Sequence, residues 1–379
     1  MNGKITKALI LLALSLTATT GYSARRRTPP PPSSQHPAGY DQGHGAESHQ
    51  MMGGYNAPAR YDVNGAWDFF IMADFIYWQP RQDNMAIATG IPQAANAAIS
   101  RDYDSDVIYQ KFSWKPGFKV GLGMNFGHDN WGGLVEYTWF HNTHKTSSSA
   151  PDFANGGSLF LQWVSIPQFT QPFFNGTPSG FDSKWRLGMD LLDFLLFRTY
   201  YVGTNLSFKT AFGGRVTWID QKFNLTTLLA APNPIGITSF NTRYKSDSWA
   251  LGPRVSLEMN WMLGYGFSLV SNVAGDISYT RYKKVSFRND ELLNVGAPGS
   301  SAQWKVSQLR PHAETGFGLG WGSYFWDNGF HIQFSATYDF QVWWNQNMLK
   351  ALFGNLYLLG EINGNLYTHG LDLKVKFDF

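Results

Sequence analysis

The chain has 379 residues, of which 16% are aromatic, 39 are glycine and only 15% are charged, against roughly 25% charged residues in typical soluble domains. The aromatic content excludes a disordered chain, and a mean hydropathy of −0.26 does not fit a bundle of membrane-spanning helices. A net charge of +3 offers no basic surface to nucleic acid, and the lack of cysteine excludes disulfides. This composition favours a β protein in which apolar and polar residues alternate.

The first residues predict an export signal. Lys4 and Lys7 precede the apolar run ALILLALSLTA, and small residues that suit a cleavage site follow it. This order is typical of a secretory signal peptide, which we place at 1–23, rather than of a buried N-terminal helix. Four consecutive prolines among Ser, Gly and His residues predict a flexible periplasmic linker at 24–60. We expect the folded domain to occupy 61–379.

The folded domain shows a repeated two-residue period. It is clearest in 249–261, where apolar residues alternate with small or charged ones and Trp249 and Trp261 bracket the apolar face. Successive side chains of a strand point to opposite faces, so this segment predicts a strand with one apolar face. At ~3.3 Å per residue it reaches ~40 Å, enough for a tilted crossing of a ~25 Å apolar band. The same alternation recurs in 118–126, 309–321, 330–341 and 371–379.

The connections between these strands alternate in length. Four are short and rich in Gly, Asn or Asp, at 128–132, 203–205, 263–266 and 323–329. Five are long and polar or proline-bearing, at about 79–113, 146–183, 224–246, 283–303 and 343–363. Short periplasmic turns and long external loops are typical of an up-and-down barrel. We therefore predict an all-β, transmembrane, antiparallel barrel of about ten strands, or twelve if 158–164 belongs to an extra hairpin.

The predicted barrel is closed and inserted into an outer membrane. In hydrocarbon every backbone N–H and C=O must be paired, which an open sheet cannot achieve. An even number of strands places both termini in the periplasm. The chain ends on Phe377 and Phe379, a pattern that we interpret as the signal read by the barrel assembly machinery. The expected partners are therefore this machinery and outer-membrane lipid, and a homo-oligomer is possible.

Several stretches resemble the Legionella-type pore-forming major outer membrane protein family, whose porin-like relatives occur in environmental chlamydiae. The similar stretches are Trp67–Trp78 (WDFFIMADFIYW), Trp185–Asp193 (WRLGMDLLD), Arg198–Gln221, Trp249–Trp261 and Gly370–Phe379. The resemblance covers about 65–379 in patches and consists of strand patterns rather than catalytic signatures. It implies a pore in the bacterial outer membrane and implies no catalytic residues.

Charged residues assigned to the inner face are the candidate pore-lining residues. They are Asp74, Lys119, Glu136, Arg186, Asp190, Lys209, Arg215, Arg254, Glu258, Arg310, Glu314 and Asp339. Rings of fixed charge select ions and solutes, so these residues would govern passage. The alternative is that they pair across strands and plug a narrow lumen, as side chains fill small barrels. Because the set is mixed in sign, we predict no strong preference for anions or cations.

The favoured function is a porin-like pore for passive diffusion of small hydrophilic solutes and ions. The main alternative is a surface structural or adhesive barrel with a plugged lumen. An outer-membrane hydrolase is less favoured, because His141, His144 and the serines at 147–149 stand in no recognisable catalytic motif. We expect neither enzymatic activity, nor a cofactor, nor a metal, nor binding of nucleic acid.

Overall fold

The computed structural model describes residues 68–91, 105–126, 130–151, 157–163, 178–230, 238–294, 301–351 and 363–379, together with a few isolated positions such as Ala59 and Tyr61. The signal peptide and nearly all of the linker that the sequence predicts lie outside the described residues. No helix in the described part of the chain is long and apolar enough to cross a membrane.

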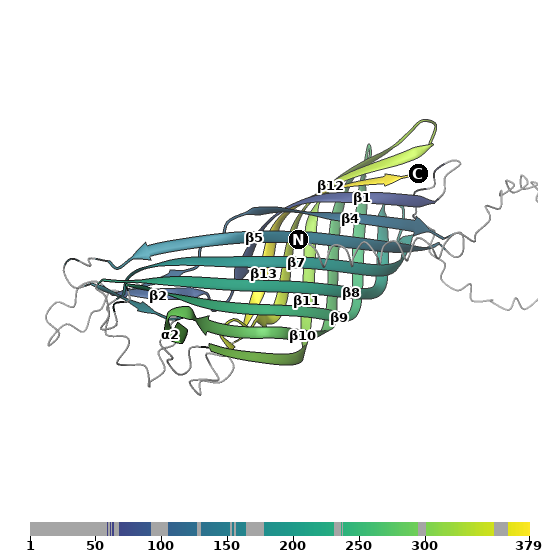
Figure 1. Cartoon of the computed structure of the whole chain (residues 1–379). Helices are drawn as coiled ribbons and strands as arrows, with labels where there is room; N and C mark the ends of the chain where they lie inside the picture. The colour runs from purple at the N-terminus through teal and green to yellow at the C-terminus, as the bar shows by residue number, and fades with distance from the viewer. Residues whose placement is uncertain are drawn as a thin grey trace, which may run out of the picture. The chain divides into compact units, whose positions relative to one another are not determined.

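Ten antiparallel strands form a closed barrel in the order β1-β13-β12-β11-β10-β9-β8-β7-β5-β4, and the pairing of β1 with β4 closes the ring. Figure 1 shows strands β7 to β11 running side by side along the barrel wall. The strands are β1 (Phe69–Gln82), β4 (Lys115–Asn125), β5 (Trp131–Ser149), β7 (Pro178–Tyr201), β8 (Leu206–Leu229), β9 (Ser239–Gly264), β10 (Phe267–Asn289), β11 (Ser301–Phe325), β12 (Phe330–Asn347) and β13 (Gly364–Asp378). The prediction of a ten-stranded transmembrane β-barrel is confirmed.

Three further strands form a separate small sheet in the order β3-β2-β6, which we call the inner sheet. They are β2 (Ala86–Ile91), β3 (Asp106–Tyr109) and β6 (Ser158–Leu161). The segment 158–164 that would have raised the count to twelve thus contributes β6 to this sheet, and the twelve-stranded alternative is wrong. A short helix, α2 (Asp290–Asn294), follows β10.

The barrel has two unlike ends. The turns after β4, β7, β9 and β11 are short and form what we call the turn end, where both described termini of the barrel also lie. The opposite end, the loop end, carries the longer connections. Long loops are extracellular and short turns periplasmic in outer-membrane barrels, which orients the molecule.

The strands are longer than the sequence predicts. Strand β9 has 26 residues and reaches ~80 Å at ~3.3 Å per residue, far more than a membrane requires. Much of the predicted loop 224–246 is paired strand, since the β8–β9 ladder continues to Leu228 and Ser239. The predicted loops at 146–183 and 283–303 are present but shorter, because β5 and β7 extend to Ser149 and Pro178, and β10 and β11 extend to Asn289 and Ser301. Outside the membrane a strand no longer needs an apolar outer face. The sequence of such a strand is therefore polar and resembles that of a loop.

The outer surface between the two ends is an apolar band bordered by aromatic residues. On β9, Leu251 and Val255 are 52% and 62% exposed, whereas Arg254 on the other face is 5% exposed. At the loop-end border, Trp139 and Trp218 both pair with Asp190, and Trp218 pairs with Trp249, which places the three rings on one row. Exposed aromatic residues at the turn end, including Trp261 and Phe267, form the second border. Two such borders flanking a ~25 Å apolar band are typical of outer-membrane barrels.

The inside of the barrel changes character along its axis. In the loop-end half, inward-facing Trp78, Trp185, Phe223 and Tyr244 are fully buried and form one apolar cluster with residues of the inner sheet. The inner sheet is tied to this cluster by Trp163, whose Nε1 donates a hydrogen bond to the Ala86 carbonyl oxygen at 2.6 Å. The loop-end half therefore has a packed apolar core, while the turn-end half is lined by charged side chains.

Candidate functional site: the charged lumen

Most of the candidate residues lie on the inner face of the barrel. Each of them belongs to the set of side chains that alternates with the exposed apolar residues of its strand. These inward residues are Asp74, Lys119, Glu136, Lys209, Arg215, Arg254, Glu258, Arg310, Glu314 and Asp339. Their role in conduction stays a prediction, because position alone does not measure ion flow.

Two of the candidates, Arg186 and Asp190, lie on the outer face, so the prediction that they line the lumen is wrong. Arg186 is exposed between Trp185 and Leu187, which are 0% and 1% exposed and face the apolar core. Asp190 accepts a hydrogen bond from the Tyr137 hydroxyl at 2.7 Å on the outer face. The interior is apolar at this height, so apolar residues point inward and the usual alternation of a membrane strand is inverted.

A buried network of charges crosses the middle of the lumen. Arg215 of β8 forms two hydrogen bonds to the Asp193 carboxylate of β7, both at 2.6 Å, with side-chain exposures of 3% and 2%. The second Arg215 terminal nitrogen, Nη1, lies 3.5 Å from Glu314 and 3.7 Å from Asp276. This bidentate geometry is the strong form of an arginine–carboxylate pair. We call the six charged or titratable residues of this level the central network: Asp193, Arg215, Arg254, Asp276, His312 and Glu314.

Arg254 and His312 complete the central network. The Arg254 guanidinium is hydrogen-bonded to Glu314 and also lies 3.5 Å from Asp193. His312 lies with Nδ1 2.7 Å from Asp276, and its ring stacks on Trp343 with centroids 3.7 Å apart. The network draws on strands β7 to β11, so it spans half of the ring and joins strands that are not neighbours.

A second group of ion pairs lies on the opposite wall. Lys119 of β4 contacts Asp372 at 2.6 Å and Asp339 at 3.5 Å, and Lys374 lies 3.6 Å from Asp74. Lys374 and Asp74 lie on the neighbouring strands β13 and β1, whereas Lys119 reaches past β1 to carboxylates of β13 and β12. The two groups together place cations and carboxylates side by side at the middle of the barrel.

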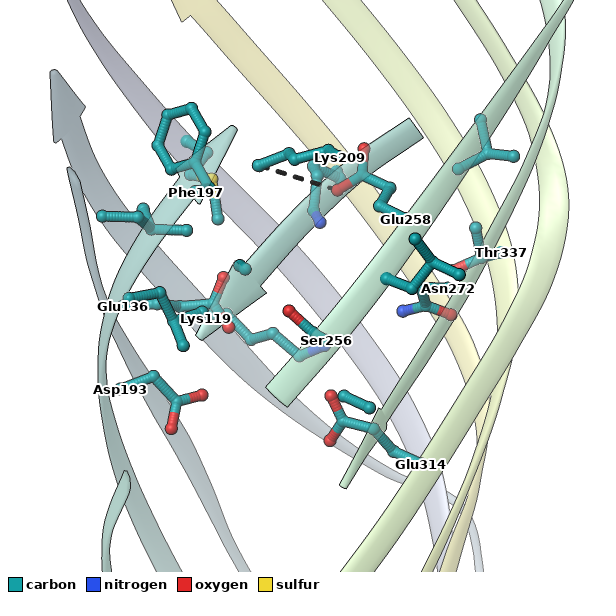
Figure 2. Close-up of a pocket in the computed structure, with 18 of the residues that line it drawn as sticks. Lys119, Glu136, Asp193, Phe197, Lys209, Ser256, Glu258, Asn272, Glu314 and Thr337 are labelled. Atoms are coloured by element: carbon teal, nitrogen blue, oxygen red, sulfur yellow. Dashed lines mark ion pairs between the residues drawn. The ribbon is translucent and has the colours of Figure 1, made fainter. Parts of the chain in front are cut away.

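Between these groups lies a chamber of about 110 Å³, whose lining includes Lys119, Glu136, Lys209, Glu258 and Glu314. Figure 2 shows the ion pair of Lys209 and Glu258 on neighbouring strands of its wall, with a separation of 3.7 Å. The chamber holds fixed charges of both signs around a space large enough for a few water molecules. This is an arrangement in which small polar solutes can be solvated by side chains instead of bulk water.

The turn-end mouth is narrowed by the residues that precede the barrel. Tyr61 stacks on inward-facing His331 with ring centroids 3.8 Å apart, and Lys376 lies 5.3 Å above the Tyr61 ring. The backbone N–H of Ala59 donates to the carbonyl oxygen of Thr199 at 3.2 Å. Ala59 and Tyr61 are therefore held against the inner wall of the mouth.

Several residues of the charged lumen were not among the candidates. Asp276, Asp372 and Lys374 stand in alternating stretches, so the two-residue period alone would have found them. Asp193 lies in the run LLDFLLF, where apolar residues occupy both faces and no alternation exists. Its place inside the barrel follows only from the strand pairing.

The closed ring, the apolar outer band and the charged lumen define a bacterial outer-membrane β-barrel protein. The sequence model of the family described as Legionella pneumophila major outer membrane protein precursor matches residues 62–379. The chain belongs to this family and is a protein of the bacterial outer membrane.

Three solved structures that resemble this chain are distant in sequence. The Escherichia coli outer membrane protease OmpT has 9% identity and a TM-score of 0.35, covering 83% of this chain and 98% of its own. The outer membrane protein AlkL has 10% identity and a TM-score of 0.26, covering 90% and 98%. A Pseudomonas aeruginosa FadL homologue has 8% identity and a TM-score of 0.24, covering 82% and 89%. No curated protein gives a significant match. At these scores the likenesses carry no argument about function.

Proposed function

We propose that the protein is a narrow outer-membrane pore for small hydrophilic solutes and ions. The observation that carries this proposal is the chamber in the turn-end half, where charges of both signs surround a polar space inside a closed barrel. A barrel with a purely structural role does not need charged groups in its interior, because apolar packing stabilises a core without the cost of removing charges from water.

Passage in this proposal requires two movements. The central network must open, and the inner sheet must move away from the apolar core at the loop end. Ion pairs of mixed sign suit the first movement, since a passing ion can replace one partner of a pair as it goes through. The inner sheet suits the second, since among the described residues its strands pair with one another and not with the barrel strands.

A second candidate function is a structural or adhesive surface barrel with a closed lumen. The specific observation in its favour is the apolar core of the loop-end half, in which Trp78, Trp185 and Phe223 are fully buried. A packed core of this kind blocks water and ions for as long as it remains intact.

Planar-bilayer conductance of the refolded full chain separates the two candidates. The pore proposal expects wild-type channels, with a reversal potential that moves toward anions when the chamber charge is changed by Glu258→Gln. The matched control is Leu257→Gln, the neighbouring outward-facing position, which should leave the reversal potential unchanged. The variant Trp163→Ala should loosen the inner sheet. If this variant conducts ions and the wild-type protein does not, the closed-lumen barrel is correct and the pore proposal fails.

A further inference from the structure

A compact group of cations lies on the outer wall, above the loop-end row of tryptophans. Lys145 faces Lys184 in the β5–β7 ladder, and Arg186 faces Lys222 in the β7–β8 ladder. Lys184 and Arg186 are two residues apart on one strand, so the four side chains form a block on a single face. We call Lys145, Lys184, Arg186 and Lys222 the basic patch.

The four cations of the basic patch are without ionic partners within the described part of the chain. No carboxylate oxygen there lies within 4.0 Å of their charged nitrogens, although Lys245 and Arg243 on the next strand pair with Asp247 and Asp290. Like charges that face each other directly on neighbouring strands destabilise a sheet. Two such pairs side by side are stable together when an anion binds between them.

The surface at the basic patch is hollowed. A shallow depression of about 540 Å³ is lined by Lys145, Lys184 and Arg243 together with hydroxyl and amide groups such as Thr226 and Asn224. The carboxylate of Asp182 also belongs to the lining, and of the basic patch only Lys145 and Lys184 do. Lysines, an arginine, hydroxyls and amides are donors that suit phosphate and sugar oxygens.

The height of the basic patch on the barrel identifies the environment in which it lies. Arg186 and Lys222 are each four residues beyond the tryptophan row at Asp190 and Trp218, a distance of ~13 Å along the strands. With the ~35–45° tilt of barrel strands this is ~10 Å above the aromatic border, the height of lipid headgroups and the sugars attached to them. The intervening row holds Asp220 and Asp247, paired in register, so the cations begin only beyond it.

We propose that the basic patch binds the phosphorylated headgroup of lipopolysaccharide in the outer leaflet. The charge, the depression and the height all point to a phosphate-bearing glycolipid that lies against the barrel wall. Its acyl chains would lie along the apolar band below the tryptophan row, and its phosphates would bridge the facing cations. This lipid would also hold the barrel at a fixed orientation in the leaflet.

Titration of the refolded full chain in detergent with bisphosphorylated lipid A tests the proposal. The patch variant carries Lys184→Gln, Arg186→Gln and Lys222→Gln. Since each cation near an anionic lipid contributes roughly fivefold in affinity, its dissociation constant should rise about a hundredfold. The matched control removes three exposed cations elsewhere, with Arg81→Gln, Lys111→Gln and Lys305→Gln, and should bind like wild type.

Three further measurements test whether the patch binds the phosphates of the lipid rather than free phosphate. Lipid A without phosphates should bind the wild type as weakly as bisphosphorylated lipid A binds the patch variant, and inorganic phosphate should not compete at millimolar concentration. The single variant Lys222→Gln, with a loss of roughly fivefold, serves if the triple variant fails to fold. The proposal would be overturned if the patch variant bound bisphosphorylated lipid A as tightly as wild type does. It would also be overturned if wild type bound both forms of lipid A equally, or if inorganic phosphate competed effectively.

Discussion

At the scale of single residues, the lumen is held by charges that are buried and paired. Arg215 and Asp193 are almost fully buried, and their bidentate contact joins β7 to β8. Removing one member of a buried pair leaves the other charge without a partner in a region of low dielectric. That penalty exceeds the loss of the attraction itself.

We expect Arg215→Met to lower the free energy of unfolding by about 3–5 kcal/mol. The reason is that Asp193 would remain buried as an uncompensated carboxylate. Urea unfolding of the refolded protein in detergent measures this, and the double variant Arg215→Met, Asp193→Leu should recover much of the loss. Lys209→Met is the control, since Lys209 and Glu258 are 3.7 Å apart and partly exposed, and its cost should stay below about 1 kcal/mol.

Lys350, in the connection after β12, provides a test by pH. Its ammonium group is buried and lies 4.4 Å from the centroid of the Trp163 ring. Burial lowers the pKa of Lys350 from 10.5 to about 8. Between these two values the unfolded chain binds a proton that the folded protein has lost, so the free energy of unfolding rises with pH, by up to about 3 kcal/mol. Lys350→Met should remove this rise when wild type and variant are compared from pH 7 to pH 10.5. Exposed Lys305→Met should leave the rise unchanged, and a wild-type profile parallel to that of Lys350→Met would contradict the assignment.

At the scale of strands, β9 shows what the sequence could and could not reveal. Its alternation between Trp249 and Trp261 correctly predicts which residues face lipid and which face the lumen. In β7 the same reasoning misplaces Arg186 and Asp190, because the interior is apolar there. No local pattern distinguishes an apolar residue that faces lipid from one that faces a packed core, and only the pairing of strands decides. The inner sheet was also missed, since β3 and β6 have four residues each and carry too short a period to recognise.

The two faces of β9 give a prediction for the strand. Val255 lies six residues from both Trp249 and Trp261, at the middle of the apolar band, and is 62% exposed. Val255→Arg should cost roughly 2–4 kcal/mol, because it places a charge near the centre of the bilayer. Leu263→Arg, near the turn-end border, should cost only about 0–1 kcal/mol. Folding equilibria in lipid vesicles measure both, and equal costs would show that the band is placed wrongly along the strand.

The neighbouring Arg254 gives the complementary result. It faces the lumen and contacts Glu314 and Asp193, so Arg254→Glu should destabilise the barrel by placing three carboxylates together. In molecules that still fold, the proposed pore should shift its reversal potential toward cations. A stable Arg254→Glu variant with unchanged stability would show that the central network does not contribute to the fold.

At the scale of the whole molecule, closure of the ring depends on both ends of the chain. β1 pairs with β13, and the Phe379 backbone N–H donates to the carbonyl oxygen of Phe69 at 3.1 Å. Phe377 and Phe379 were interpreted from the sequence as the assembly signal. Their rings lie together at the turn end, with centroids 5.6 Å apart.

We expect Phe379→Ser to reduce the amount of protein in the outer membrane far more than Asp378→Asn does. The reason is that the terminal aromatic ring would be recognised before folding, whereas Asp378 faces the lumen beside His331. Quantification of the protein in outer-membrane fractions measures the effect, and refolding of both variants in detergent separates assembly from stability. Equal outer-membrane levels would show that Phe379 carries no assembly signal.

The inversion of the apolar face along β7 has a consequence for how the protein sits in its membrane. Below the tryptophan row the outer face of the wall is apolar and contacts lipid. Above that row the outer face is polar and contacts water, and the inner face is apolar and contacts the packed core. A shift toward the cell exterior would expose the apolar band to water, and a shift inward would drag Arg186 and Lys222 into hydrocarbon. Both displacements cost free energy, so the barrel has a single preferred depth. A membrane of different thickness would have to deform around the protein, and such a protein would be sorted into bilayers whose thickness matches its band.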